Sequence, residues 1–151
     1  NMYISQNGLD FIAKWEGCVL TPYKDVAGLR TIGVGHLIKP GENFPDGVSI
    51  TRDQAYMLLR KDVARCENAI KKAFPNSPLN QNQFDALCSF GFNCGVGVYT
   101  SSSAAKAIVS GNYDDVGPSL LLWSKAKING VSTTVPGLLA RRQAEVDLFY
   151  S

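Results

Sequence analysis

One long amphipathic segment, residues 51–73, divides the chain into two parts with different patterns. Thr51-Arg52-Asp53-Gln54 matches a capping box at its start, and Pro75 follows its end. Apolar residues recur through it at helical spacing: Ala55, Leu59, Cys66, Ile70 and Ala73. The segment therefore predicts a single long helix that connects two lobes of one domain.

The part of the chain before this helix mixes helical and extended patterns. Residues 5–16 predict a helix that ends at Gly17. Residues 23–37 then consist of short extended pieces around a turn at 25–28, which predicts a small β-hairpin.

The part after the long helix carries further helical patterns and a loop at 127–134. The expected helices cover residues 80–94, 101–110, 113–125 and 136–150. We therefore expect a mostly helical α+β fold that forms one domain over residues 1–151. Its parts are a helix-plus-β lobe at about 1–50, the connecting helix at about 51–74 and an all-helical lobe at about 75–151.

Composition excludes several classes of protein. Charged residues make up 19% of the chain and hydrophobic residues 45%, a balance that argues against disorder. No apolar run approaches the roughly 20 residues of a membrane-spanning helix, so we expect no membrane insertion. A net charge of +2 without a clustered basic stripe argues against a nucleic-acid partner.

The cysteines and the single histidine give no recognisable metal site. Cys18, Cys66, Cys88 and Cys94 include no Cys-x-x-Cys pair, and only His36 could assist them. We therefore expect neither a metal nor a cofactor. The even number of cysteines leaves disulfides and buried core thiols open as alternatives.

Glu16 places a carboxyl group on the apolar face of the first predicted helix. Leu9, Ile12 and Ala13 lie at positions i, i+3 and i+4, and Glu16 continues this stripe at i+7. Burial favours the protonated form of a carboxyl group, which is the form that a general acid needs. Glu16 is therefore a candidate general acid, and a structural ion pair at the helix end is the alternative.

The predicted strand Arg30–His36 has one face with almost no side chains. That face carries only Thr31, Gly33 and Gly35, and alternating glycines indicate close approach by a ligand or by another backbone. Asp25 stands at the other end of the turn, where it either provides a second carboxylate or only initiates the turn. Two carboxyl groups of different burial beside an open groove are typical of glycoside hydrolysis.

Three short motifs at these positions resemble those of a known family. Trp15-Glu16-Gly17, Tyr23-Lys24-Asp25 and Thr31-Ile32-Gly33-Val34-Gly35-His36 resemble the signature of phage-type lysozymes, glycoside hydrolase family 24, also called endolysins or muramidases. Supporting similarities follow at residues 90–95 and 136–145, so the resemblance spans nearly the whole chain.

The resemblance implies a lysozyme-like fold and hydrolysis of the β-1,4 bond between N-acetylmuramic acid and N-acetylglucosamine in peptidoglycan. It implies that Glu16 is the general acid, that Asp25 activates a water and that Thr31 helps to hold this water. The family's usual outcome is inversion at the anomeric carbon. A retaining muramidase, a lytic transglycosylase and a non-catalytic wall-binding module are the alternatives.

Two ion pairs are expected to support the site. Arg142 falls near the middle of the apolar stripe of the last predicted helix, and the resemblance makes it the partner of Glu16, with Arg141 as the less favoured candidate. Arg142 could instead only lay its stem along the core. The lone histidine, His36, is expected to be structural, and the resemblance pairs it with Asp62.

Two further residues are expected to bind the glycan. Gly33 belongs to the bare strand face, and Asn93 resembles the family position that offers an amide to the sugar. A helix C-cap is the alternative for Asn93.

The expected partner is the glycan strand of peptidoglycan, in the periplasm or cell wall of a bacterium. We expect a monomer, and a cognate immunity or inhibitor protein stays open as a second partner. Asn1 precedes Met2 without a charged-then-apolar leader, so we expect no signal peptide in this chain, and a cloning scar and a domain excised from a larger protein are the alternatives for its start. Phage release, a secreted antibacterial effector and an acquired lysozyme all fit these expectations.

Overall fold

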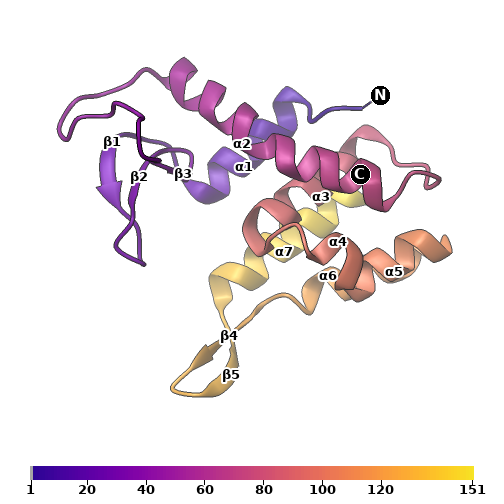
Figure 1. The fold of residues 1–151 in the computed structure, drawn as a ribbon. Coiled ribbons are helices and arrows are strands. Elements are labelled where there is room, and N and C mark those ends of the chain that lie inside the picture. Colours follow the sequence, from indigo (N-terminus) through magenta and orange to yellow (C-terminus); the bar gives the residue numbers. More distant parts are fainter. Residues whose placement is uncertain (1) are drawn as a thin grey trace. The chain divides into compact units, whose positions relative to one another are not determined.

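The computed structural model describes residues 2–151 and divides them into two compact units. Residues 9–64 form one, called here the β-sheet unit. Residues 2–8 and 65–151 form the other, called the helical unit. Two helices carry the chain from one unit to the other, α1 (Gln6–Glu16) and α2 (Arg52–Ala73). The long helix predicted at 51–73 is therefore present, and it continues from the β-sheet unit into the helical unit (Figure 1).

The β-sheet unit holds a three-stranded antiparallel sheet in the order β1-β2-β3. Its strands are β1 (Val19–Lys24), β2 (Arg30–Gly33) and β3 (His36–Leu37). Apolar residues from this sheet, α1 and α2 form a buried core: Leu9, Ile12, Ala13, Ile32, Val34, Ala55, Leu59 and Val63. The mixed α+β character expected from the sequence is confirmed.

The strand expected at 30–36 ends earlier, at Gly33, because the backbone turns there. Gly33 and Gly35 have φ angles of +69° and +65°, a region that glycine enters without steric cost. The turn at 34–35 leads directly into β3, which places Ile32 opposite His36. The single bare strand face predicted for Thr31, Gly33 and Gly35 is therefore divided between a strand and a turn.

Gly33 lies close to helix α2 on the side where a Cβ atom would be. A Cβ atom added to Gly33 would lie 3.3 Å from Cβ of Ala55. The close backbone approach that the sequence indicated therefore includes the approach of a helix, and the contact of Gly33 with a ligand stays a prediction.

The helical unit is built from the second half of α2 and a set of shorter helices. These are α3 (Gln81–Cys94), α4 (Val98–Ser101), α5 (Ser103–Ser110), the 3-10 helix η1 (Tyr113–Asp115), α6 (Val116–Leu121) and α7 (Pro136–Phe149). Asn80 and Gln83 form a capping box at the start of α3, and Ser102 caps α5. Helices α3 and α7 pack against each other, and both match the sequence-based expectation closely.

The expectation that the chain after α2 forms only helices and loops is wrong at residues 125–134. Strands β4 (Lys125–Ile128) and β5 (Val131–Thr134) pair there as an antiparallel hairpin. Asn129 and Gly130 supply its tight turn with φ angles of +51° and +78°, as two-residue hairpin turns require. The helix expected at 113–125 is correspondingly shorter and ends at Leu121.

The contact between Gly33 and α2 can be tested by Gly33→Ala. We expect the free energy of unfolding to fall by about 2 kcal/mol or more, because the new methyl group crowds Ala55 and the positive φ disfavours any L side chain. Gly41→Ala is the matched control. Its φ is +91° and no atom lies within 4 Å of the added Cβ, so only the backbone strain of about 1 kcal/mol should remain. Equal losses in urea denaturation of the two variants would contradict the packing argument.

Candidate active site

Glu16 is the last residue of α1 and lies against the backbone of Gly35. The helix ends there because the Gly17 amide donates to the Ala13 carbonyl at 2.8 Å while Gly17 adopts a φ of +81°. A Cβ atom added to Gly35 would lie 3.3 Å from Oε1 of Glu16. The Glu16 side chain is half-buried, so its carboxyl group is less enclosed than the helical stripe predicted.

Asp25 initiates the turn between β1 and β2 with one of its two carboxylate oxygens. Oδ1 accepts hydrogen bonds from the amides of Ala27 and Leu29, both at 2.9 Å. Among the described residues, no hydrogen bond reaches Oδ2. The turn-forming role that we gave as an alternative is therefore present, and it leaves the second oxygen available.

Thr31 is fixed to the same turn from the other side. Its hydroxyl Oγ1 donates to the carbonyl of Leu29 at 3.0 Å, and the residue is almost completely buried. The backbone of Leu29 therefore donates its amide hydrogen to Asp25 and accepts the hydroxyl hydrogen of Thr31. Because both contacts involve one short main-chain segment, the two side chains are held in a defined relation.

Tyr23 is a member of this group that the sequence analysis did not select. It pairs with Thr31 across strands β1 and β2 and precedes Asp25 by two residues. Partial burial raises the pKa of the Tyr23 phenol, and the negative charges of Glu16 and then Asp25 raise it further. Both carboxyl groups therefore act on the same phenol. Its cross-strand position opposite Thr31 is the signal that could have identified it.

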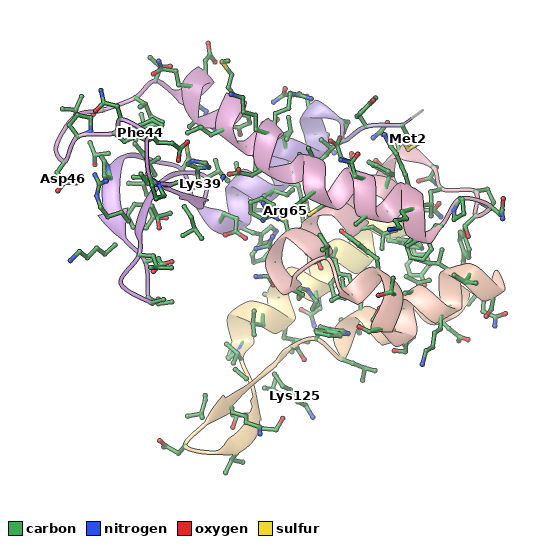
Figure 2. The ribbon with its side chains drawn as sticks, viewed as in Figure 1. Met2, Lys39, Phe44, Asp46, Arg65 and Lys125 are labelled. Atoms are coloured by element: carbon green, nitrogen blue, oxygen red, sulfur yellow. The ribbon has the colours of Figure 1, made fainter. Side chains whose placement is uncertain are left out.

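His36 lies between two carboxylates in the β-sheet unit. Nδ1 is 2.7 Å from Oδ2 of Asp62, the partner that the resemblance suggested. Nε2 is 3.0 Å from Oε1 of Glu42, which the sequence analysis did not anticipate. Phe44 adds an edge-to-face ring contact to the imidazole at 6.3 Å. Lys39 and Phe44 mark this loop after β3 (Figure 2).

Glu42 is a charged anchor for this loop. Oε1 accepts a hydrogen bond from the amide of Lys39 at 2.7 Å. That bond lowers the pKa of Glu42 most, and the contact with His36 lowers it further, against a smaller opposing effect of burial. The carboxylate therefore connects the loop to the buried imidazole.

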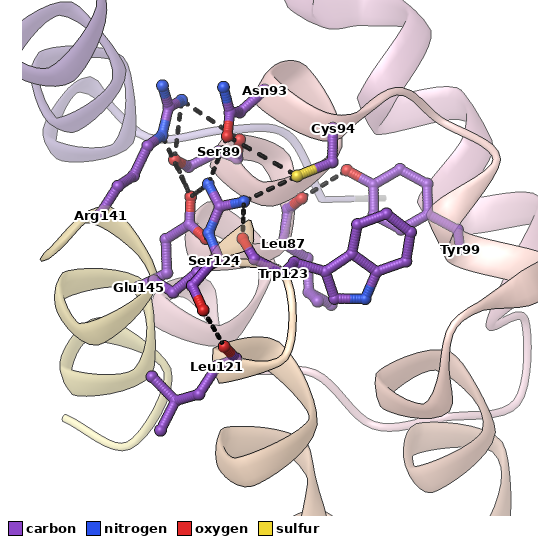
Figure 3. A network of polar contacts seen from close by, with 11 residues as sticks. Leu87, Ser89, Asn93, Cys94, Tyr99, Leu121, Trp123, Ser124, Arg141 and Glu145 are labelled. Carbon is purple, nitrogen blue, oxygen red and sulfur yellow. Dashed lines mark hydrogen bonds and ion pairs between the residues drawn. The ribbon is translucent and has the colours of Figure 1, made fainter. Parts of the chain in front are cut away.

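Arg142 is fully buried in the helical unit, and the carboxylate that contacts it is Glu145. Figure 3 labels its partners Glu145, Asn93, Cys94 and Trp123. Nε lies 2.7 Å from Oε1 of Glu145, and Nη2 donates to Oε2 at 3.1 Å and to Oδ1 of Asn93 at 2.7 Å. Nη1 donates to Sγ of Cys94 at 2.7 Å and to the Trp123 carbonyl at 3.5 Å. These contacts engage both Nη atoms, while Nε faces Oε1 of Glu145 without hydrogen-bond geometry. They identify Glu145 as a partner that the sequence analysis did not name, and the pairing of Arg142 with Glu16 stays a prediction.

Glu145 completes this buried network. Ser89 Oγ donates to its Oε2 at 2.6 Å, and Nε of Arg141 lies 3.4 Å from the same oxygen. Burial raises the pKa of Glu145, and the charge of Arg142 opposes this effect. The sequence analysis missed Glu145, although its position three residues after Arg142 places the two side chains on one helical face.

Asn93 is exposed, and its amide is oriented by the buried arginine. An arginine only donates hydrogen bonds, so the atom that faces Arg142 is the carbonyl oxygen Oδ1, and the NH₂ group points elsewhere. Gly95 forms the C-cap of α3, so the alternative of Asn93 as a C-cap does not hold. The arrangement presents two N–H donors to an incoming acceptor.

The remaining expectations concern metals, membranes and cysteines. Within residues 2–151 no cluster of three His, Cys, Asp or Glu side chains has the arrangement of a metal site. Across the same residues, no helix combines the length and the apolar character that crossing a bilayer requires. All four cysteines are free thiols, and burial raises the pKa of Cys66 to about 11.

Comparison with known proteins assigns this arrangement of residues to a family. The family model described as "Phage lysozyme" matches residues 13–145. The chain is 42% identical to an endolysin of Acyrthosiphon pisum secondary endosymbiont phage 1 and 39% identical to an endolysin of Salmonella phage P22, each over 99% of both chains.

Solved structures agree with the sequence relatives. The muramidase domain of SpmX from Asticaccaulis excentricus superposes with a TM-score of 0.89 at 30% identity, covering 100% of this chain and 99% of that one. A mutant of P22 lysozyme also gives a TM-score of 0.89, at 37% identity and 100% coverage of both chains.

The anchoring role of Glu42 generates a prediction about pH. Because its pKa is lower in the folded protein than in the unfolded chain, its contribution to stability is complete above pH about 4.5 and is lost as the pH falls through the folded-state pKa. We expect Glu42→Gln to lower the free energy of unfolding by less than about 1 kcal/mol at pH 7, since the group is partly exposed, and to have little effect at pH 3.

Urea denaturation at the two pH values measures this difference. Asp114→Asn, an exposed aspartate in η1, provides a control with the same change in charge. A loss for Glu42→Gln that is equal at both pH values, or no larger than that of the control, would contradict the anchoring role.

Proposed function

The chain belongs to the phage lysozyme family and is a peptidoglycan hydrolase of the muramidase class, and from this premise we propose that it cleaves the β-1,4 bond between N-acetylmuramic acid and N-acetylglucosamine with inversion. In this proposal Glu16 is the general acid, Asp25 is the base that activates water and Thr31 holds that water. The reaction takes place in the cell wall or periplasm of a bacterium.

The observation that carries the proposal is a pair of acceptor atoms on the two sides of the Leu29 backbone. Asp25 uses Oδ1 for the turn, and Thr31 uses its hydroxyl hydrogen for the Leu29 carbonyl. Oδ2 of Asp25 and the lone pairs of Thr31 Oγ1 then serve as acceptors for the two hydrogens of one water molecule. A water bound in this way keeps a lone pair for attack on the anomeric carbon, and Oδ2 receives its proton.

The acid is supported by the contrast between the two carboxyl groups. Asp25 accepts hydrogen bonds from two backbone amides at an exposed turn, whereas Glu16 is half-buried at a helix end beside Gly35. Glu16 donates its proton to the glycosidic oxygen as the bond to the anomeric carbon breaks. The second sugar leaves as a neutral alcohol, and the reaction consumes one water.

Asn93 is proposed as a glycan-binding residue of the helical unit. Arg142 holds Oδ1, so the amide hydrogens of Asn93 are presented to the carbonyl of an N-acetyl group. Gly33 stays a proposed glycan contact of the β-sheet unit through its backbone, since Ala55 fills the space only on its Cβ side.

Glu16→Gln tests the acid assignment. The substitution keeps the shape of the side chain and removes its proton-donating ability, so we expect the rate of clearing of bacterial cell walls in a turbidity assay to fall by about 100-fold or more. The thermal unfolding curve, followed by circular dichroism, is expected to stay close to that of the wild type. Asp114→Asn, the control with the same charge change, should clear walls at the wild-type rate. Equal clearing by the wild type and Glu16→Gln would end the assignment.

The anomeric form of the first product tests the role of Asp25 and Thr31. Attack by the held water on the face opposite to the leaving group converts the β-linked sugar into an α-anomer, which NMR detects before mutarotation. A β-anomer would identify a retaining enzyme, and an anhydro-sugar end would identify a transglycosylase. Either result would refute the inverting mechanism while leaving wall hydrolysis intact.

A further inference from the structure

The hairpin β4–β5 is a two-stranded ribbon whose surface is almost entirely exposed. It extends beyond the helices of its unit (Figure 1), and Lys125 marks its base (Figure 2). A hairpin of two strands is marginally stable by itself in water. A ribbon of this kind that carries no core residues is available for binding.

The strand register gives the ribbon two different faces. Lys125 pairs with Thr134 and Lys127 with Ser132, so one face combines two ammonium groups with two hydroxyl groups. The other face contains the remaining pairs, Ala126 with Thr133 and Ile128 with Val131. We call the first of these the cationic face.

The stretch of sequence that contains the cationic face has basic residues but no acidic residues. From Val116 to Ala144 the chain contains four basic residues and no acidic residue. Arg141 and Arg142 belong to the buried network with Glu145, which leaves Lys125 and Lys127 as the exposed cations of this segment. Alternate residues of a strand lie about 7 Å apart, so the two ammonium groups can contact two anionic groups of one ligand.

The root of the ribbon is rigid and is joined to the network that orients Asn93. Ser124 is buried, and its carbonyl accepts a hydrogen bond from the Val135 amide at 2.8 Å, which closes the base. The Trp123 carbonyl accepts from Arg142, whose Nη2 also holds Asn93. One guanidinium group therefore contacts both the proposed glycan-binding amide and the backbone two residues before Lys125.

We propose that the cationic face of the β4–β5 hairpin binds the carboxylates of the peptide stems that peptidoglycan carries on its glycan strands. This inference rests on the proposed function, because it concerns a second part of the same polymer. The sugars linked by the β-1,4 bond offer mainly hydroxyl and N-acetyl groups, which Asn93 can bind. The peptide stems carry carboxylates, and ammonium and hydroxyl groups together match them as charge-assisted and neutral donors.

A comparison of two substrates tests the proposal. The variant Lys125→Gln/Lys127→Gln is assayed on intact peptidoglycan and on peptidoglycan whose peptide carboxylates have been converted to amides with a carbodiimide and ammonia. We expect its kcat/KM on intact peptidoglycan to fall about three- to tenfold at low ionic strength, and the defect to shrink as salt is added. On the amidated peptidoglycan the variant and the wild type should be equal.

Lys72→Gln/Lys106→Gln is the matched control, because it removes two exposed lysines from the same unit and changes the net charge equally. It should retain wild-type activity on both substrates. Light scattering of each variant is included because lysine on edge strands also discourages aggregation.

Several outcomes would overturn the inference. They are an equal defect on both substrates, no defect on either, a defect that the control shares, or a loss that follows aggregation. A defect of Ile128→Ser/Val131→Ser without a defect of the lysine variant would assign the ribbon to an apolar partner and would equally refute it. If the wild type were inactive on both substrates, the proposed function itself would fail, and the two failures are thus distinguishable.

Discussion

The helical unit depends on one buried contact, the ion pair between Arg142 and Glu145. Removing two charges from water costs several kcal/mol for each ion, roughly, and the cost is met only when the remaining donors and acceptors are satisfied. Arg142 donates to Asn93, Cys94 and the Trp123 carbonyl as well as to Oε2 of Glu145, and its Nε meets Oε1 of Glu145 at 2.7 Å as an ion pair without hydrogen-bond geometry. The guanidinium group of Arg142 compensates the buried carboxylate of Glu145. It thereby also joins α7 to the end of α3 and to the base of the hairpin. The buried Arg142–Glu145 pair therefore helps to position two exposed features, the amide of Asn93 and the base of the β4–β5 hairpin.

In the β-sheet unit, single side chains serve both the fold of the turn and the proposed site. Asp25 must stabilise a tight turn and also present a charged oxygen, and it divides these tasks between its two carboxylate oxygens. Thr31 makes the same division between its hydroxyl hydrogen, which is fixed, and its lone pairs, which are not. The residues that hold the backbone are thus the residues proposed to hold the water, so the accuracy of the site derives from the fold of the turn.

Much of this architecture could be predicted from local patterns, and the differences have a common physical cause. Capping and periodicity located α2, α3 and α7 closely, because each of these helices carries its own signals. The sequence pattern predicts a loop at 127–134 where the structure has a hairpin, although Asn129-Gly130 is a strong turn signal between two short strands. The neighbour of Gly33 is Ala55, twenty-two positions later in the sequence, and no periodicity indicates which element approaches a glycine. In the same way, the place of Arg142 on an apolar stripe predicts that it is buried but does not identify its partner. That partner, Glu145, lies on the same helix.

The backbone of Leu29 joins the two proposed water ligands, while its side chain is more than half exposed. The contribution of this position to the site therefore comes from its backbone amide hydrogen and carbonyl oxygen, which nearly every amino acid possesses. Substitution of the Leu29 side chain should therefore leave both backbone hydrogen bonds in place. Proline is the exception, because it lacks the amide hydrogen that Asp25 accepts. A position that sequence comparison would rank as variable can in this way be indispensable to the enzyme.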